Sequence, residues 1–341
     1  MACALRCPRK YFYDYVLGLT AETPSEALRV GSAVHNALEA RAHGRPFEDQ
    51  FRAACEGTQL DEFTAARVFG IIGAYDRVYG EVEDRDIAEM SPEVQFDDNI
   101  DGSRAFYQAG KVDGLAVTHD GRKVVVEHKT TSDDVSPTSD YWNRLRHNHQ
   151  VMAYAAWVYH TTGELPTFVY DVIRKPQLMP LANVPELDEQ GLPIVLDANG
   201  NRRIKRDGTP KKTADAAKGE HLAGHPETAD EYGKRILETM TTEVDWYFAR
   251  REVEITEDML EEYSRERIGV CRMLLHFAAE SRKAKLPEYG YPRSCSPDNC
   301  RSCPFAGFCL ERIHVDANNQ PQGFVIAFHP ELSAEASAEA V

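Results

Sequence analysis

The stretch GKVDGLAVTHDGRKVVVEHKT, residues 110–130, carries the clearest structural pattern of the chain. β-branched residues are frequent in it, and Asp120-Gly121 near its centre is typical of a hairpin turn. A two-residue loop would put Asp113 and Glu127 on opposite faces of the sheet, whereas a loop over residues 119–121 places them opposite each other. We predict the longer loop, with Gly121 at positive φ, because glycine adopts that conformation without steric cost. A bulge elsewhere is the competing way to reach the same register.

The second strand of this hairpin ends in charged residues. Glu127 and Lys129 project to the same side, because side chains alternate between the two faces of a strand. Two carboxylates beside a lysine form an oxygen-rich site of the kind that Mg²⁺ and Mn²⁺ prefer, and the lysine can hold a water or offset charge on a phosphate. A surface salt bridge is the alternative interpretation. Three valines leading directly into Glu127 argue against it, since the charges of a solvated strand normally alternate with apolar residues.

The patterns on both sides of the hairpin predict a mixed sheet covered by helices. Apolar residues at helical spacing predict helices over about 24–41, 46–79 and 141–161. Strands are predicted at 92–98, 105–118, 122–130 and 167–173. This order implies an antiparallel meander followed by one strand that a crossover helix returns to the sheet.

The remainder of the chain has a different composition. Residues 176–227 are rich in Pro, Gly and Asp, and within residues 201–218 seven Lys or Arg stand against two Asp. We interpret this basic stretch as a solvated hairpin rather than a contact with nucleic acid. Helices are predicted again at about 228–248 and 257–284, with Thr256 as the cap of the second.

The composition of the 341 residues indicates a folded chain with an acidic surface. The hydrophobic share is 42% and the charged share 28%, both near the average for globular proteins. No apolar run approaches the roughly 18 residues of a membrane span, and MACALRCPRK does not match a signal peptide, so we expect a cytoplasmic protein without a membrane partner. The net charge of −16 argues against a whole-surface electrostatic grip on nucleic acid but not against a local one. The loop motifs of kinases, dehydrogenases and esterases are absent from the sequence.

Cysteines form the second strong signal. Cys300, Cys303 and Cys309 need a fourth ligand to complete a metal site, and Cys7 is the best candidate, with Cys295 and Cys3 as alternatives. Four thiolates at such spacing fit Zn²⁺ or an iron–sulfur cluster equally well. Reducing compartments favour metal binding over disulfides for these cysteines.

Taken in order along the chain, these features resemble the RecB-like branch of the PD-(D/E)XK nuclease superfamily. More narrowly, they are similar to iron–sulfur exonucleases related to the AddB nuclease domain and to CRISPR-associated RecB-like nucleases. The resemblance covers about residues 5–310. It rests on an ordered set of motifs, namely Cys7-Pro8, Gly31 to His35, Asp113, Glu127-x-Lys129, Gln150 to Tyr154, and the three C-terminal cysteines.

The resemblance implies a fold and a role for each of these residues. The fold is an α/β restriction-endonuclease-like core of order αβββαβ with helical additions. Asp113 and Glu127 would bind the catalytic Mg²⁺ or Mn²⁺, with His35 and the His128 carbonyl as further ligands. Lys129 would orient the water, and Gln150 and Tyr154 would position Lys129 or the nucleic acid strand. A [4Fe-4S] cluster on Cys7, Cys300, Cys303 and Cys309 would tie the two ends of the chain together.

We therefore expect a metal-dependent DNA exonuclease that acts on single strands or duplex ends in DNA processing, recombination or repair. A helicase or recombination protein is the candidate partner. A vestigial nucleic-acid-binding or assembly module with a structural cluster is the main alternative, and a zinc-binding scaffold is the second. The expected parts are an iron–sulfur staple (1–25 with 285–315), a helical lobe (26–90), the nuclease core (91–175), a basic insertion (176–227), C-terminal helices (228–284) and a tail (316–341).

Overall fold

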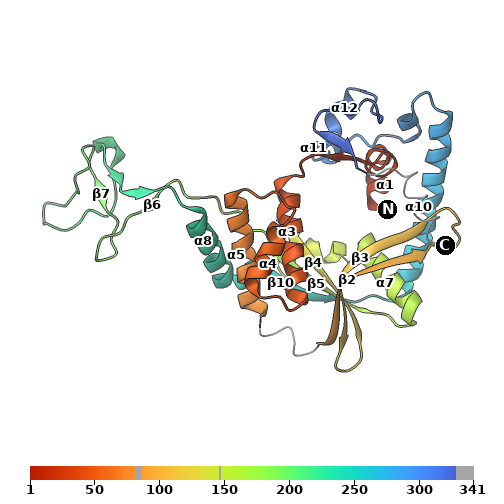
Figure 1. Cartoon of the computed structure of the whole chain (residues 1–341), viewed down its shortest axis with the longest axis horizontal. Helices are drawn as coiled ribbons and strands as arrows, with labels where there is room; N and C mark the ends of the chain where they lie inside the picture. The colour runs from red at the N-terminus through yellow and green to blue at the C-terminus, as the bar shows by residue number, and fades with distance from the viewer. Residues whose placement is uncertain (81–86, 146, 328–341) are drawn as a thin grey trace.

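In the computed structural model the chain is built around a five-stranded mixed sheet (Figure 1). The structure describes residues 1–80, 87–145 and 147–327. The strand order is β10-β5-β4-β3-β2, with β4 and β5 parallel and every other neighbouring pair antiparallel. The bounds of these strands are β2 (Ile87–Asn99), β3 (Tyr107–Thr118), β4 (Lys123–Thr131), β5 (Thr167–Arg174) and β10 (Phe248–Val253). The predicted meander and crossover are confirmed, and β10 adds an edge strand that the sequence patterns did not indicate.

The hairpin between β3 and β4 has the predicted register. Gly114 pairs with Val126 and Val117 with Lys123, so residues 119–121 form the loop. The amide of Gly121 donates to the Thr118 carbonyl at 2.9 Å, and Gly121 has φ +87°. The three-residue loop and the left-handed glycine are therefore confirmed.

Helices cover both faces of the sheet. Helices α3 (Glu26–Ala42), α5 (Glu62–Tyr79) and α8 (Ala229–Thr242) share one apolar cluster, which also contains Ile173 and Phe248. Helix α7 (His149–Thr162) packs on the opposite face against Val125, Phe168 and Val172. The central strands of the sheet are thus packed between two separate apolar layers, one on each face.

Three predicted helices are divided in the structure: the one at 228–248 breaks at Glu243 into α8 and α9 (Val244–Tyr247), and the other two restart at a capping residue. The predicted helix 46–79 consists of α4 (Phe47–Cys55) and α5, because Gly57 adopts φ +69° and the Asp61 side chain caps a new helix. The predicted helix 141–161 consists of α6 (Asp140–Leu145) and α7, with Asn148 as the cap of the second. In both cases a local side-chain cap outweighs the continuing apolar pattern.

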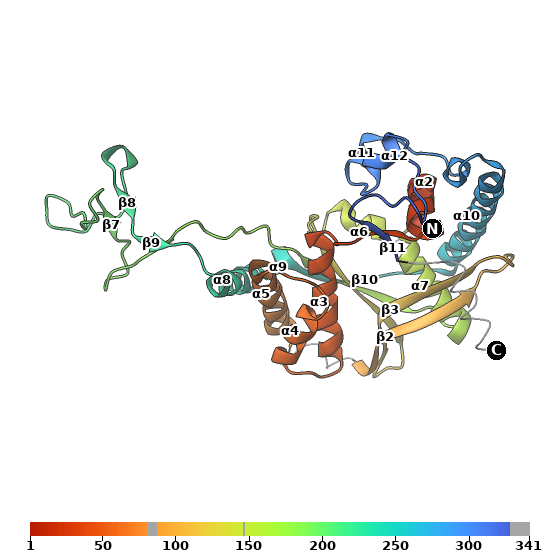
Figure 2. The same cartoon turned by 45° about the horizontal axis from the view of Figure 1, so that its top comes forward.

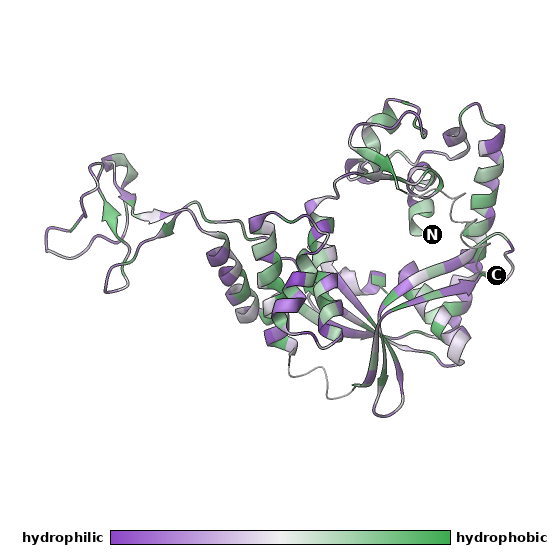
Figure 3. Cartoon of the chain, viewed as in Figure 1, coloured by the Kyte–Doolittle hydropathy of each residue, from purple (hydrophilic) through white to green (hydrophobic). Residues whose placement is uncertain are grey.

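The N-terminal segment and the C-terminal segment up to residue 327 lie side by side above the sheet (Figure 1). Strand β1 (Leu19–Ala21) pairs with β11 (Phe324–Ile326), whose hydrophobic residues are visible in Figure 3. The stretch expected as a tail, residues 316–341, thus contains the strand β11, and its residues 328–341 lie outside the described residues. The other elements of this region are α1 (Ala2–Arg6), α2 (Pro8–Tyr11), η1 (Phe12–Val16), α10 (Glu257–Lys283), η4 (Pro287–Gly290), α11 (Pro297–Arg301) and α12 (Ala306–Leu310).

The insertion predicted at 176–227 forms an arm that projects away from the body (Figures 1 and 2). Two short ladders stiffen it, β6 (Val184–Pro185) with β9 (Gly224–His225) and β7 (Val195–Leu196) with β8 (His221–Leu222). The buried carboxylate of Glu220 binds both Arg203 and Lys211, so part of the basic stretch is neutralised within the arm. A further short helix is η3 (Ala216–Lys218).

No helix among residues 1–80, 87–145 and 147–327 is long and apolar enough to cross a membrane.

Candidate active site

The candidate site lies where the β3–β4 ladder ends. The last paired residues are Gly114 and Val126, and beyond them the carboxylate of Asp113 accepts a hydrogen bond from the His128 backbone amide at 2.8 Å. Asp113 and Glu127 are therefore neighbours at the opening of the ladder rather than a regular ladder pair. Helix α3 approaches from above, and its His35 Nδ1 lies 3.5 Å from Asp113 Oδ2.

A chain of hydrogen bonds leads from Glu127 to helix α7. Lys129 Nζ donates to Glu127 Oε1 and, at 2.8 Å, to Gln150 Oε1. Gln150 in turn donates to the Tyr154 hydroxyl at 2.7 Å, and Tyr154 donates to the Lys111 carbonyl at 2.7 Å on β3. The predicted residues Glu127, Lys129, Gln150 and Tyr154 thus lie together, joined by direct contacts.

The absence of a side chain at Gly110 allows Tyr154 to approach β3. A Cβ at Gly110 would lie 2.8 Å from the Phe96 ring and 3.2 Å from the Tyr154 ring, closer than side chains normally pack. Gly31 plays a similar part on α3, where a Cβ would lie 3.3 Å from Thr130 Oγ1 of β4. These two glycines let α7 and α3 pack closely on the strands that carry the charged residues.

The two carboxylates have opposite electrostatic environments. Burial raises the pKa of Glu127 to about 7, and the negative charge of Asp113 adds to the rise while Lys129 opposes it. Burial also raises the pKa of Asp113, but the hydrogen bond and charge of His35 outweigh it, so the net shift is downward. Asp113 thus favours the charged form while Glu127 resists it. Neighbouring carboxyls with pKa values shifted in opposite directions are typical of functional sites.

The donor set fits a divalent cation. Glu127 is 1% exposed, and no donor among the described residues contacts its buried Oε2. An unpaired carboxylate oxygen in such a position is costly unless a cation or water satisfies it. Among the described residues no three His, Cys, Asp or Glu side chains stand close enough to hold an ion as they are placed here. The fit therefore rests on the chemistry of the oxygens and on the unsatisfied Oε2.

His128 occupies a different position from the other predicted residues. Its ring lies on the opposite side of the strand from Glu127 and Lys129, where Nδ1 is 3.1 Å from Asp171 Oδ2 of β5. Asp171 is fully buried and also accepts hydrogen bonds from Tyr75 and Arg250. Burial raises the pKa of Asp171, but the bonds from His128 and the charge of Arg250 prevail and lower it well below its usual range. Sequence reasoning missed this cluster, although an aspartate inside the apolar run TFVYDVI was a visible signal.

Comparison with known proteins identifies the family. The family model of the PD-(D/E)XK nuclease superfamily matches residues 1–310. The chain belongs to this superfamily. Its members are generally nucleases and typically use divalent metals such as Mg²⁺, and the mixed sheet agrees with their fold. This confirms the broad resemblance inferred from the motifs.

Other comparisons add little to this assignment. A solved structure described as "Crystal structure of SSO0001" aligns with 70% of this chain and 84% of its own, at 11% identity and a TM-score of 0.21, a likeness too weak to inform the fold. No curated protein matches the chain significantly.

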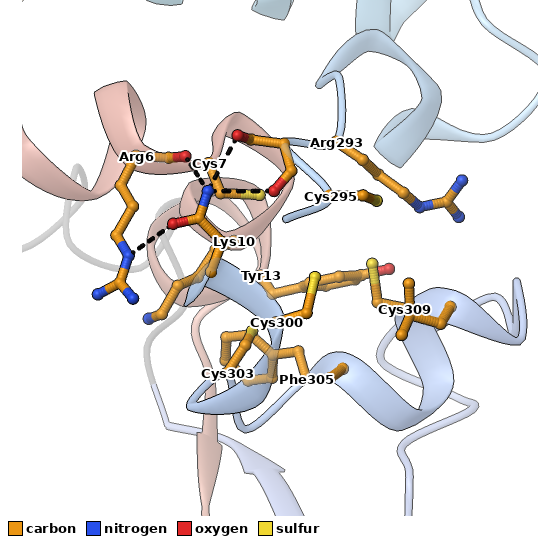
Figure 4. Close-up of a pocket in the computed structure, with 14 residues that line it drawn as sticks. Arg6, Cys7, Lys10, Tyr13, Arg293, Cys295, Cys300, Cys303, Phe305 and Cys309 are labelled. Carbon is orange, nitrogen blue, oxygen red and sulfur yellow. Dashed lines mark hydrogen bonds between the residues drawn. The ribbon is translucent and has the colours of Figure 1, made fainter. Parts of the chain in front are cut away.

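In this superfamily member five cysteines lie together outside the sheet, where the N-terminal and C-terminal segments meet. Cys7, Cys295, Cys300, Cys303 and Cys309 line one pocket with Tyr13 and Phe305 (Figure 4). Cys3 lies on a different cavity and its thiol donates to Asp14, so it does not share this pocket. Thiols from both ends of the chain are the ligand type that soft metals and iron–sulfur clusters prefer, but no three of these described cysteines stand close enough together here to hold an ion.

Protein contacts already join the two ends around this pocket. Arg9 donates to the Tyr291 carbonyl at 2.9 Å, and Arg6 donates to Asn299 at 3.0 Å. Phe12, Tyr13, Tyr291 and Phe305 form a buried aromatic cluster beside the cysteines. Hydrogen bonds and aromatic packing thus hold together the two chain segments that line the pocket.

Proposed function

We propose that the chain is a metal-dependent deoxyribonuclease of the RecB-like branch, an exonuclease that hydrolyses DNA phosphodiesters during DNA processing, recombination or repair. The observation that carries the proposal is the contact chain from Glu127 through Lys129 to Gln150, beside a buried carboxylate oxygen without a donor. Superfamily membership supports a nuclease and a divalent metal in general terms.

The residues of the site then have separate tasks. Asp113 and Glu127 would hold Mg²⁺ or Mn²⁺, with His35 and the His128 carbonyl as the further ligands. When bound, the cation supplies Lewis-acid stabilisation of the charge that develops on the phosphodiester. Lys129 holds an attacking water by donating to it, and Gln150 keeps the Lys129 ammonium in place through the 2.8 Å bond. Tyr154 anchors Gln150 to the backbone of β3.

A large cavity beside the site supports a single-stranded substrate. It has a volume of about 590 Å³ and lies between the N-terminal helices, β3, α7 and α10. Gln150 and Tyr154 form part of its wall, so the cavity reaches the contact chain of the site. Aromatic side chains on which unpaired bases can stack also line it, namely the exposed Tyr15 and Tyr107 and the half-buried Tyr11, Phe106 and His149.

We further propose that Cys7, Cys300, Cys303 and Cys309 hold a structural [4Fe-4S] cluster. The pocket that they line is placed between the chain ends, away from Glu127 and Lys129, so its role would be to join those ends. A protein purified under anaerobic conditions should be brown and contain iron rather than zinc.

The function is tested with end-labelled single-stranded and duplex DNA under anaerobic conditions, with and without Mn²⁺. The wild type should shorten the labelled strand only with the metal present, and Glu127→Gln should abolish this. Glu252→Gln removes an exposed glutamate from β10 of the same sheet and should keep full activity. A folded, iron-loaded wild type without hydrolysis under any of these conditions would assign the chain to the vestigial binding module.

A further inference from the structure

His128, Asp171 and Arg250 form a row across three adjacent strands. Asp171 is the direct partner of His128 in the parallel β4–β5 ladder and of Arg250 in the antiparallel β5–β10 ladder. Side chains of directly paired residues stand on the same face of a sheet. The row is therefore set by the register of the strands and not by one rotamer.

A single carboxylate oxygen is the centre of this row. Asp171 Oδ2 lies 3.1 Å from His128 Nδ1 and 2.9 Å from Arg250 Nη2, and it also accepts from the Tyr75 hydroxyl. Arg250 donates to that hydroxyl at 3.0 Å and lies over the Tyr79 ring of α5 at 4.1 Å. Asp171 and Tyr75 are buried, so these bonds are made in a medium of low dielectric, where they are strong and costly to lose.

The row acts on the residue between the two charged side chains of the site. His128 follows Glu127 and precedes Lys129, and its backbone amide donates to Asp113 at 2.8 Å. Holding the His128 ring on one side of β4 fixes the backbone from which Glu127 and Lys129 project on the other side. It also fixes the amide that holds Asp113.

We propose that Asp171, held by Tyr75 and Arg250, is a positioning residue that orients the metal-binding strand segment through His128. The inference rests on the proposed function, because it assigns the row a task in that site. Residues that orient metal ligands from behind typically change metal affinity or activity by about 10- to 100-fold when they are removed.

The chain offers a matched pair of variants for the test. The Tyr75 hydroxyl donates to Asp171 and accepts from Arg250, while the equally buried Tyr232 hydroxyl donates to the Leu178 carbonyl and accepts from Arg67 at 3.1 Å. Tyr75→Phe and Tyr232→Phe therefore each remove one buried hydroxyl beside an arginine. Only Tyr75 touches the row.

The measurements are Mn²⁺ binding without DNA, hydrogen exchange of the His128 amide, and thermal unfolding, each for Asp171→Asn, Tyr75→Phe and Tyr232→Phe. We expect Asp171→Asn to weaken Mn²⁺ binding about 10- to 100-fold and to speed exchange at His128, and Tyr75→Phe to do so to a lesser extent. Tyr232→Phe should lower the melting temperature while leaving Mn²⁺ binding and His128 exchange at wild-type values.

The outcomes separate the two proposals. If the wild type binds Mn²⁺ and Asp171→Asn binds it equally well, the row is only structural and this inference is overturned while the proposed function stands. If Asp171→Asn and Tyr232→Phe weaken binding equally, the effect comes from general destabilisation and the inference is also overturned. A wild type that binds no Mn²⁺ would overturn both.

Discussion

Lys129 and Gln150 are joined by a 2.8 Å hydrogen bond although they are 21 residues apart, with α6 between strand β4 and helix α7. The same ammonium also donates to Glu127, so Lys129 connects the buried carboxylate to the helix on that face of the sheet. The side chain of Lys129 is 27% exposed, which leaves part of it accessible to water and substrate.

Lys129→Ala should lower DNA hydrolysis by at least about a hundredfold while the protein remains folded, because the ammonium would act on water and not on the apolar core. Circular dichroism and iron content should match the wild type. Lys123→Ala removes a lysine from the other end of the same strand and should keep full activity. Hydrolysis by Lys129→Ala at the wild-type rate would show that the site is assigned to the wrong residues.

The β3–β4 hairpin and the Gln150–Tyr154 pair could be predicted from the sequence, because each depends only on residues close together in the chain. The hairpin loop over residues 119–121 follows from the steric freedom of glycine, and it fixes the register of β3 and β4. The four-residue spacing of Gln150 and Tyr154 follows from the helical repeat. None of these steps requires knowledge of contacts between distant segments.

Gly121→Ala tests the left-handed conformation of that loop. A Cβ at Gly121 would meet nothing within 4 Å, so the whole effect comes from its φ of +87°. We expect the free energy of unfolding to fall by about 1 kcal/mol, measured by denaturant titration. Gly269→Ala in α10 also meets nothing within 4 Å but has helical neighbours, and it should raise stability by about 0.5–1 kcal/mol. Equal effects in the two variants would contradict the strain at Gly121.

The part that sequence patterns missed depends on long-range pairing. Strand β10 contains FARREV, which lacks a clear alternation of apolar and polar residues, and its partner, β5, lies far away in the sequence. Arg250 therefore could not be matched with Asp171 before the ladder was known. The pairing of β1 with β11 was missed for the same reason, since each strand has three residues and joins opposite ends of the chain.

Cys303→Ala tests the proposed cluster. Closing a very long loop restricts the unfolded chain strongly, so loss of the cluster should lower both the iron content and the melting temperature, together with solubility. Cys55→Ala removes a cysteine at the end of α4, away from the pocket, and should change neither iron nor solubility. Unchanged iron content and thermal stability in Cys303→Ala would exclude the cluster at this place.

A histidine near the joined chain ends predicts a pH dependence of stability. His314 Nδ1 lies 2.9 Å from Glu288 Oε1, and Nε2 lies 3.1 Å from Asp316 Oδ2. The hydrogen bond to Glu288, together with the charges of both carboxylates, raises the pKa of His314 above its ordinary value of 6.5. The folded state therefore binds the proton more tightly than the unfolded state does.

The sign of the effect follows from this linkage. The stabilisation is fully present below pH 6.5 and is lost as the pH rises through the higher pKa of folded His314. Because the side chain is 32% exposed, solvent screening limits the contribution to less than about 1 kcal/mol. Thermal unfolding at about pH 5.5 and about pH 8.5 should show a larger loss of stability in the wild type than in His314→Gln, because the variant lacks the titrating ring. Since all other titrating groups are common to both proteins, an identical loss would mean that His314 keeps its ordinary pKa in the folded protein.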